Sequence, residues 1–203
     1  MMQFSQVEIV AARLDVDQGV EHALTAWLSD AERQRACRFR LARDRRRYAV
    51  ARGCLRQLLA DRLCTHPRSV QLCCGAHGKP RLVPGSAAVD WRFNVSHSGN
   101  LALLAFCRGR ELGIDVEQVH ALQDADAIAP MVFPPRELAA FLSLAPRDRA
   151  LGFFGGWTRT EAIAKARGVG LQHSGARGED ADWRVHSFSP APGYVAALAV
   201  ERS

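Results

Sequence analysis

Apolar and polar residues along the chain follow two periods, one typical of strands and the other of helices. Residues 3–14 alternate loosely, as in a strand, and further strands are expected over residues 70–74, 92–96, 101–107, 112–119, 185–188 and 194–200. The helical period occurs in residues 44–64 and 147–167. Strands and helices therefore follow one another in both parts of the chain.

Local signals place further helix ends. Ser29 and Glu32 have the spacing of a capping box, which predicts that a helix begins beside them. Pro134-Pro135 predicts the first turn of another helix. Gly168 predicts the end of the helix over 147–167. We therefore expect an α+β fold of two similar halves, each a small antiparallel sheet packed with helices.

The two expected halves, residues 1–110 and 111–203, differ in charge. The chain of 203 residues carries a formal net charge of +6. Residues 1–108 hold 17 basic and 9 acidic residues, or +8, and residues 109–203 hold 10 and 12, or −2. This asymmetry favours an anionic ligand on the first half and a metal ion on the second.

Composition narrows the class of protein. No stretch approaches the roughly 18 apolar residues of a membrane span, and the first residues lack the features of an export signal. The six cysteines form no Cys-x-x-Cys pair, which argues against a zinc site and against a disulfide framework. We expect a cytoplasmic protein with reduced thiols.

Polar groups interrupt apolar stretches at residues 93–99, 113–117 and 157–165, where burial is costly unless the groups bind something. Asp115 and Glu117 lie two apart on an expected strand and share a face, and such paired oxygens suit Mg²⁺. The alternative is an exposed strand face with two solvated acids.

Trp157, Glu161 and Lys165 share one face of an expected helix. Glu161 is placed to complete a metal site, and Lys165 to reach a phosphate one turn further. Two alternatives stay open at this point. Glu161 and Lys165 could form a surface ion pair, or Thr158 and Glu161 could form a second capping box.

The segment Ser96-His97-Ser98-Gly99 combines hydroxyls, an imidazole and a glycine at an expected turn, a combination that can bind phosphate. A Ser–His nucleophile is the weaker interpretation, because neighbouring residues of a strand point apart and no Gly-x-Ser-x-Gly elbow is present. An ordinary hairpin turn is the third possibility.

The arginines between residues 33 and 47 are dense and suit nucleic acid, a phosphorylated cofactor or an acidic protein. The only two lysines, Lys79 and Lys165, both fall within candidate sites. Gly78-Lys79-Pro80 is a basic turn without the spacing of a Walker loop.

Taken together, the order and spacing of four motifs resemble the 4′-phosphopantetheinyl transferase superfamily, in its surfactin-synthetase-activating branch. Three motifs match in full: Gly-Lys-Pro at 78–80, Phe-Asn-x-Ser-His-Ser-Gly at 93–99 and Gly-Ile-Asp-x-Glu at 113–117. The fourth, Trp-x-x-Lys-Glu-x-x-x-Lys, matches residues 157–165 except at residue 160. The resemblance implies transfer of the phosphopantetheine arm of coenzyme A to a serine of an apo acyl or peptidyl carrier protein, with release of 3′,5′-ADP.

The resemblance also implies roles for single residues. Mg²⁺, with Mn²⁺ as an alternative, would bind Asp115, Glu117 and Glu161. Glu161 would activate the carrier serine, and Lys165 would bind the pyrophosphate. The other coenzyme A contacts that the resemblance implies are Arg35, Arg47, Lys79, Pro80, Asn94, Ser96 and His97. Of these, His97 is also an implied catalytic residue.

Two departures from the family pattern stand out. Thr160 replaces a lysine, from which we expect weaker substrate binding, and the stretch after Leu171 is short, which bears on carrier docking. We expect a pseudo-dimeric monomer without nucleic-acid or membrane partners. The rival hypothesis is a basic nucleic-acid-binding protein, which explains the arginines but not Asp115, Glu117 and Glu161.

Overall fold

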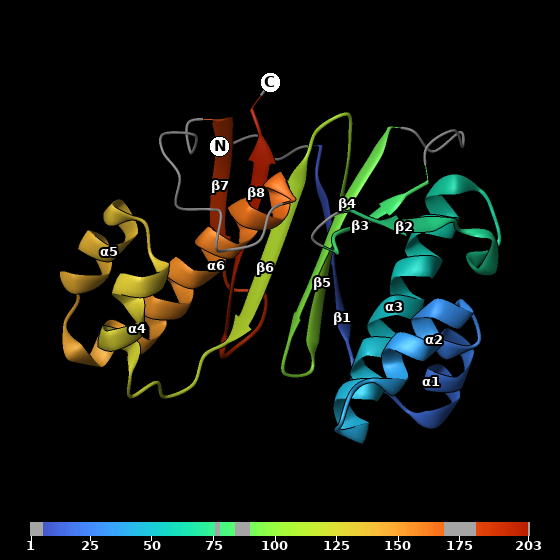
Figure 1. Cartoon of the computed structure of the whole chain (residues 1–203), viewed down its shortest axis with the longest axis horizontal. Helices are drawn as coiled ribbons and strands as arrows, with labels where there is room; N and C mark the ends of the chain where they lie inside the picture. Colours follow the sequence, from blue (N-terminus) through green and yellow to red (C-terminus); the bar gives the residue numbers. More distant parts are fainter. Residues whose placement is uncertain (1–5, 76–77, 84–89, 169–181, 203) are drawn as a thin grey trace.

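The computed structural model describes residues 6–75, 78–83, 90–168 and 182–202. Its first part contains a three-stranded antiparallel sheet of order β1-β5-β4, a small hairpin and three helices (Figure 1). These elements are α1 (Gln18–Thr25), α2 (Asp30–Cys37), α3 (Ala42–Leu63), β1 (Glu8–Arg13), β2 (Leu72–Cys74), β3 (Pro80–Leu82), β4 (Trp91–Ser98) and β5 (Leu101–Arg108), with a 3-10 turn at Pro67–Ser69.

The second part contains another three-stranded antiparallel sheet, of order β6-β8-β7. Its elements are β6 (Leu112–Gln118), β7 (Trp183–Phe188), β8 (Tyr194–Glu201), α4 (Ala125–Val132), α5 (Pro135–Leu142) and α6 (Arg149–Arg167), with a 3-10 turn at Pro146–Asp148. The expected α+β fold with two antiparallel sheets is confirmed. The strand expected over 70–74 is confirmed as β2, whereas α1, α4 and β3 were not predicted.

The layers run helix, sheet, sheet, helix (Figure 1). Helix α3 packs on one face of the first sheet, with Leu55 and Leu59 against Leu104 and Phe106. The opposite face of β5 packs against β6 and β8, and α6 covers the far face of the second sheet. Because both of its faces are covered, β5 is a continuous apolar run rather than an alternating one.

Helix α6 lies unusually close to β6 at Gly113. A Cβ at this position would lie 2.1 Å from the carbonyl oxygen of Ala162 and 2.4 Å from the nitrogen of Ala166. Only glycine tolerates that approach. The close contact brings the last turns of α6 over the strand that carries Asp115 and Glu117.

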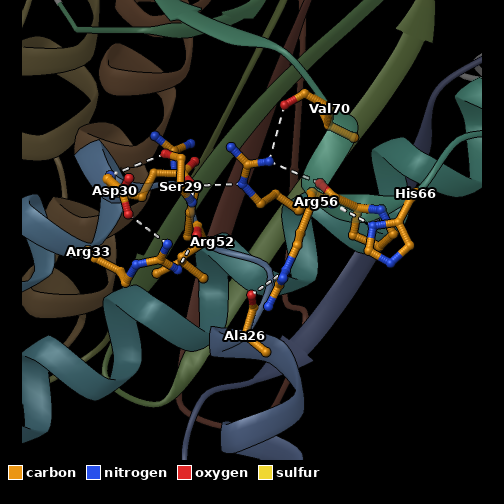
Figure 2. A network of polar contacts seen from close by, with 12 residues as sticks. Ala26, Ser29, Asp30, Arg33, Arg52, Arg56, His66 and Val70 are labelled. Carbon is orange, nitrogen blue, oxygen red and sulfur yellow. Dashed lines mark hydrogen bonds and ion pairs between the residues drawn. The ribbon is translucent and has the colours of Figure 1, made fainter.

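A buried arginine joins the helices of the first part (Figure 2). Arg56 of α3 donates to Glu32 at 2.6 Å and to the carbonyls of Pro67 and Val70 at 2.9 and 3.1 Å. Glu32 also accepts from the backbone of Ser29, so the expected capping box at the start of α2 is confirmed. The arrangement satisfies a charge that would otherwise be costly to bury.

Candidate active site

The two carboxylates of β6 lie at the junction between the sheets rather than on a solvated face. Asp115 is only 2% exposed and Glu117 is half-buried, while Ile114 and Val116 point into the core. The alternative of an exposed acidic strand face is therefore wrong.

Strand β4 presents a row of polar side chains to the backbone of β6. The N–H groups of Ile114, Val116 and Gln118 donate to Asn94 Oδ1 at 2.9 Å, Ser96 Oγ at 3.4 Å and Ser98 Oγ at 3.1 Å. Each pair is 20 residues apart, so the two strands run parallel. These side chains supply the acceptors that a neighbouring backbone would supply in a continuous sheet.

The serines also bind the carboxylates. Ser96 Oγ donates to Asp115 Oδ1 at 2.8 Å, and Ser98 Oγ donates to Glu117 Oε2 at 2.7 Å. The polar face of 93–99 and the acidic face of 113–117 are therefore brought together as one structure. Asn94 and Ser96 are buried with internal partners, and their assignment to coenzyme A rests on the resemblance alone.

Lys165 reaches this junction from α6. Its Nζ lies 2.5 Å from Asp115 Oδ1 and 3.0 Å from Ser96 Oγ. The ammonium thus pairs with Asp115, and the alternative of a surface ion pair between Glu161 and Lys165 is wrong. Helix α6 also continues unbroken through Thr158, whose hydroxyl donates to the Gly155 carbonyl, so a capping box at Thr158 is wrong as well.

Glu161 lies one turn before Lys165 and is half-buried. Burial raises its pKa, the Lys165 charge lowers it, and the charges of Asp115 and Glu117 raise it again. Burial also raises the pKa of Glu117, against hydrogen bonds from Ser98 and Trp157 that lower it. The three carboxylates are therefore close enough to repel one another, and a cation would relieve that repulsion.

The donor chemistry suits a hard metal ion. Asp115 Oδ2 is buried and makes no hydrogen bond within the described part of the chain, so one carboxylate oxygen is left over for a ligand. No three His, Cys, Asp or Glu side chains of the described residues are already gathered as a metal site. In this arrangement the Lys165 ammonium is the cation that Asp115 contacts.

A cavity of about 730 Å³ is connected to the acidic site through Ser98, which lines the cavity and donates to Glu117, although none of the three carboxylates is part of the lining. Its lining residues are Arg13, Phe39, Arg43, Asp44, Arg47, His97, Ser98, Gly99, Asn100, Gln118 and Tyr194. Arg47 and His97 were expected at a phosphate site, Arg43 was noted only as one of the dense arginines, and Arg13 and Asn100 were missed. The i, i+4 spacing of Arg43 and Arg47 on α3 is a signal that could have identified Arg43. Three arginines against one aspartate make the cavity a suitable anion site.

His97 is exposed at this cavity, on the strand of the serines. The surrounding protein lowers its pKa by desolvation, and the charge of Lys165 lowers it further. The ring is therefore held toward its neutral form, in which one nitrogen donates and the other accepts.

Three other expected contacts lie away from the cavity lining. Lys79 is 8% exposed and donates to Glu111, the Leu112 carbonyl and the Ala166 carbonyl at 2.9 to 3.1 Å, which uses all three of its hydrogens. Pro80 begins β3, and exposed Arg35 lies 5.9 Å from the ring centre of Tyr48. Their cofactor roles stay predictions.

The substitution at residue 160 also has a structural setting. Thr160 is 5% exposed, and its hydroxyl donates to the Gly156 carbonyl at 3.0 Å within α6. A threonine is accommodated here as an internal residue. The expected weakening of substrate binding by Thr160 stays a prediction. Of the stretch after Leu171, residues 172–181 lie outside the described residues, and residues 182–202 contain β7 and β8. Its effect on carrier docking stays a prediction.

Many arginines of the dense run are engaged in ion pairs within the chain. Arg33 pairs with Asp30, Arg46 with Glu21, and Arg47 with Asp15. These pairs reduce the free positive surface that a nucleic-acid-binding protein would present.

Comparison with known proteins decides the family. Residues 18–108 match the N-terminal part of the 4′-phosphopantetheinyl transferases, and residues 111–198 match the 4′-phosphopantetheinyl transferase superfamily. The transferase HetI of a Nostoc strain is 37% identical over 166 residues, which cover 82% of this chain and 70% of HetI. The chain belongs to the 4′-phosphopantetheinyl transferase superfamily.

Other transferases of the superfamily match shorter stretches. AcpT of Salmonella typhimurium is 34% identical over 56% of each chain. The human L-aminoadipate-semialdehyde dehydrogenase-phosphopantetheinyl transferase is 29% identical over 69% of this chain and 48% of its own length. The expected enzyme class, a 4′-phosphopantetheinyl transferase, is confirmed. Among the described helices, none has the length and apolar character needed to cross a membrane.

Proposed function

We propose that this transferase moves the 4′-phosphopantetheine arm of coenzyme A to a serine of an apo acyl or peptidyl carrier protein, releasing 3′,5′-ADP. One observation supports this reaction above the others. Lys165 and Asp115 meet at the sheet junction, beside an arginine-lined cavity, with Glu117 and Glu161 within electrostatic reach. Such a site combines anion binding with acid groups that can hold a metal ion and accept a proton.

The two halves would divide the work. Residues 1–110 would bind the phosphates of coenzyme A, through Arg47 and His97 at the cavity and through the backbone around Gly99. Residues 111–203 would supply the carboxylates and Lys165. Because the row of β4 side chains fixes β4 against β6, the phosphate-binding and acidic groups keep a constant geometry.

Asp115, Glu117 and Glu161 are the residues that would hold Mg²⁺, or Mn²⁺ in its place. When bound, the ion would neutralise charge on the pyrophosphate of the cofactor. The leftover oxygen of Asp115 and the raised pKa values of the two glutamates support this donor set.

The chain's own groups then have defined tasks. Glu161, whose raised pKa makes it a better proton acceptor than an ordinary glutamate, would take the proton of the carrier serine hydroxyl directly or through water. Lys165 would stabilise the negative charge that develops on the departing 3′,5′-ADP. The serine oxygen forms the new bond to phosphorus as the bond to the ADP oxygen breaks.

The resemblance to the surfactin-synthetase-activating branch supports a monomer and leaves the carrier open among those of fatty-acid, polyketide and nonribosomal peptide synthesis. A panel of apo carriers incubated with the protein, coenzyme A and Mg²⁺ tests the proposal by mass spectrometry. We expect a gain of about 340 Da on at least one carrier, the mass of the transferred arm. The absence of this gain on every class of carrier would argue against the reaction.

A further inference from the structure

Arg47, at the cavity wall, is held by a carboxylate from another part of the chain. Arg47 Nε donates to Asp15 Oδ1 at 2.8 Å, and Nη2 donates to Asp15 Oδ2 at 2.6 Å. Two parallel bonds of this kind fix the plane of a guanidinium as well as its position. The Arg47 side chain is 17% exposed, and that of Asp15 is 51% exposed.

The contact uses only one edge of the guanidinium. Asp15 occupies Nε and one hydrogen of Nη2, which leaves the edge formed by Nη1 and the second Nη2 hydrogen. Within the described residues, Nη1 of Arg47 makes no hydrogen bond, and Arg47 lines the cavity. This second edge has the spacing that matches two oxygens of a phosphate.

Asp15 is itself held firmly. The preceding residue, Leu14, is buried in the core, and its N–H donates to the Asn100 carbonyl at 2.8 Å. Asp17, two residues later, caps α1 by accepting from the N–H of Val20. The hydrogen bond from Arg47 lowers the pKa of Asp15, which keeps this carboxylate ionised. Asp15 is therefore a fixed partner rather than a mobile surface acid.

We propose that Asp15 is a positioning residue that aligns the free edge of Arg47 to bind the terminal 3′-phosphate of coenzyme A. The inference rests on the proposed function and adds to it a residue that does not line the cavity. Asp15 also brings a negative charge toward the site, which alone would weaken anion binding. The affinity gained by aligning Arg47 must therefore exceed the affinity lost to repulsion between Asp15 and the phosphate.

Isothermal titration calorimetry with coenzyme A and with dephospho-coenzyme A, which lacks the 3′-phosphate, tests the inference without a carrier. Asp15→Ala should raise the Kd for coenzyme A about tenfold, the scale of one charge-assisted hydrogen bond, and leave the Kd for dephospho-coenzyme A unchanged. Asp15→Glu, which keeps a carboxylate, should restore part of the affinity. In an Arg47→Ala background, Asp15→Ala should have no further effect.

Glu21→Ala is the matched control, because it removes a similar ion pair from Arg46, a neighbour on α3 that is not part of the cavity lining. It should leave both Kd values unchanged. Circular dichroism shows whether Asp15→Ala folds, and Asp15→Asn serves in its place if it does not. An unchanged or lower Kd for coenzyme A in the folded variant, or an equal rise for both ligands, would overturn the inference. If the wild-type protein binds neither ligand, the proposed function fails instead.

Discussion

The Ser96 hydroxyl donates a hydrogen bond of 2.8 Å to Asp115 Oδ1, so that a serine of the first sheet holds a carboxylate of the second. The same oxygen accepts from the Val116 N–H and from Lys165 Nζ. One hydroxyl therefore connects β4, β6 and α6. The contacts that join the two halves are also contacts of the candidate active site. A substitution at Ser96 would therefore affect both the junction between the halves and the active site.

Asn94→Ala tests the structural part of this junction. The substitution leaves the buried Ile114 N–H without its acceptor, and we expect the free energy of unfolding to fall by roughly 1–3 kcal/mol. Urea denaturation followed by circular dichroism measures the change. Gln57→Ala, which removes an exposed side-chain hydrogen bond on α3, should cost less than about 0.5 kcal/mol. Equal losses in the two variants would show that the β4–β6 contact contributes no special stability.

Gly113→Ala tests the close approach of α6 to β6. The added methyl group would overlap the Ala162 carbonyl and the Ala166 nitrogen, so either the helix must move or the fold must loosen. We expect a loss of more than about 2 kcal/mol in stability and a lower transfer rate.

Gly155→Ala, in α6 itself, is the matched control. A methyl group there would have its nearest neighbour at 3.5 Å, on the flexible Arg159 side chain. Because alanine favours helix more than glycine does, this variant should be stabilised by up to about 1 kcal/mol. A Gly113→Ala protein as stable as the wild type would contradict the packing described for α6.

The two glutamates predict a pH-dependent effect of Mg²⁺. Burial raises the pKa of Glu117 and Glu161 above their ordinary value of 4.5, so protonation favours the folded state. Their contribution to stability is fully present below about pH 4.5 and is lost as the pH rises through the raised folded pKa values. Above that window both acids are ionised and repel, and a bound cation should relieve the repulsion.

We therefore expect Mg²⁺ to raise the Tm more at about pH 7.5 than at about pH 5, as measured by differential scanning fluorimetry. The Glu117→Gln, Glu161→Gln double variant should lose most of this difference. An equal Tm increase at the two pH values in the wild-type protein would contradict the proposed metal ligands.

His97→Ala tests the cavity as the coenzyme A site. Desolvation and the nearby Lys165 charge lower the pKa of this histidine, which favours its uncharged form. The ring lines the cavity together with the arginines. We expect the KM for coenzyme A to rise several-fold, with a smaller fall in kcat. His22→Ala, at an exposed position on α1, should change neither constant. A fall in kcat without a rise in KM would contradict the binding role.

Local patterns were sufficient for most of the fold. The capping box at Ser29 and the stop at Gly168, which adopts a φ of 72°, determine helix ends through neighbouring residues, so the sequence alone places them. Helix α4 was missed because it contains Pro130 and is held by an aromatic cluster that includes Phe133 and Phe153. Tertiary packing of this kind leaves little trace in a local pattern.

In the candidate site too, local patterns predicted which residues share a face of a strand but not which faces come into contact. The two-residue period of a strand correctly put Asp115 and Glu117 on one face, and the side chains of Asn94, Ser96 and Ser98 lie on one face of β4 in the same way. Neither pattern could show that these two faces meet, because the contact joins strands from different sheets. The ion-pair partners of Lys79 and Arg47 could not be predicted from the sequence either. Glu111 is 32 residues from Lys79, and Asp15 is 32 residues from Arg47.

The most direct test of the central claim uses an apo carrier that accepts the arm from the wild-type protein. This carrier is incubated with coenzyme A, Mg²⁺ and either the Asp115→Asn or the Glu161→Gln variant, and its gain in mass is followed over time. Both variants should remain folded and add the roughly 340 Da arm at least about a hundredfold more slowly. Glu137→Gln, at an acid that pairs with Arg159 of α6 away from the carboxylates, should transfer at the normal rate. Transfer at the wild-type rate by either site variant would contradict the assignment of these carboxylates to catalysis.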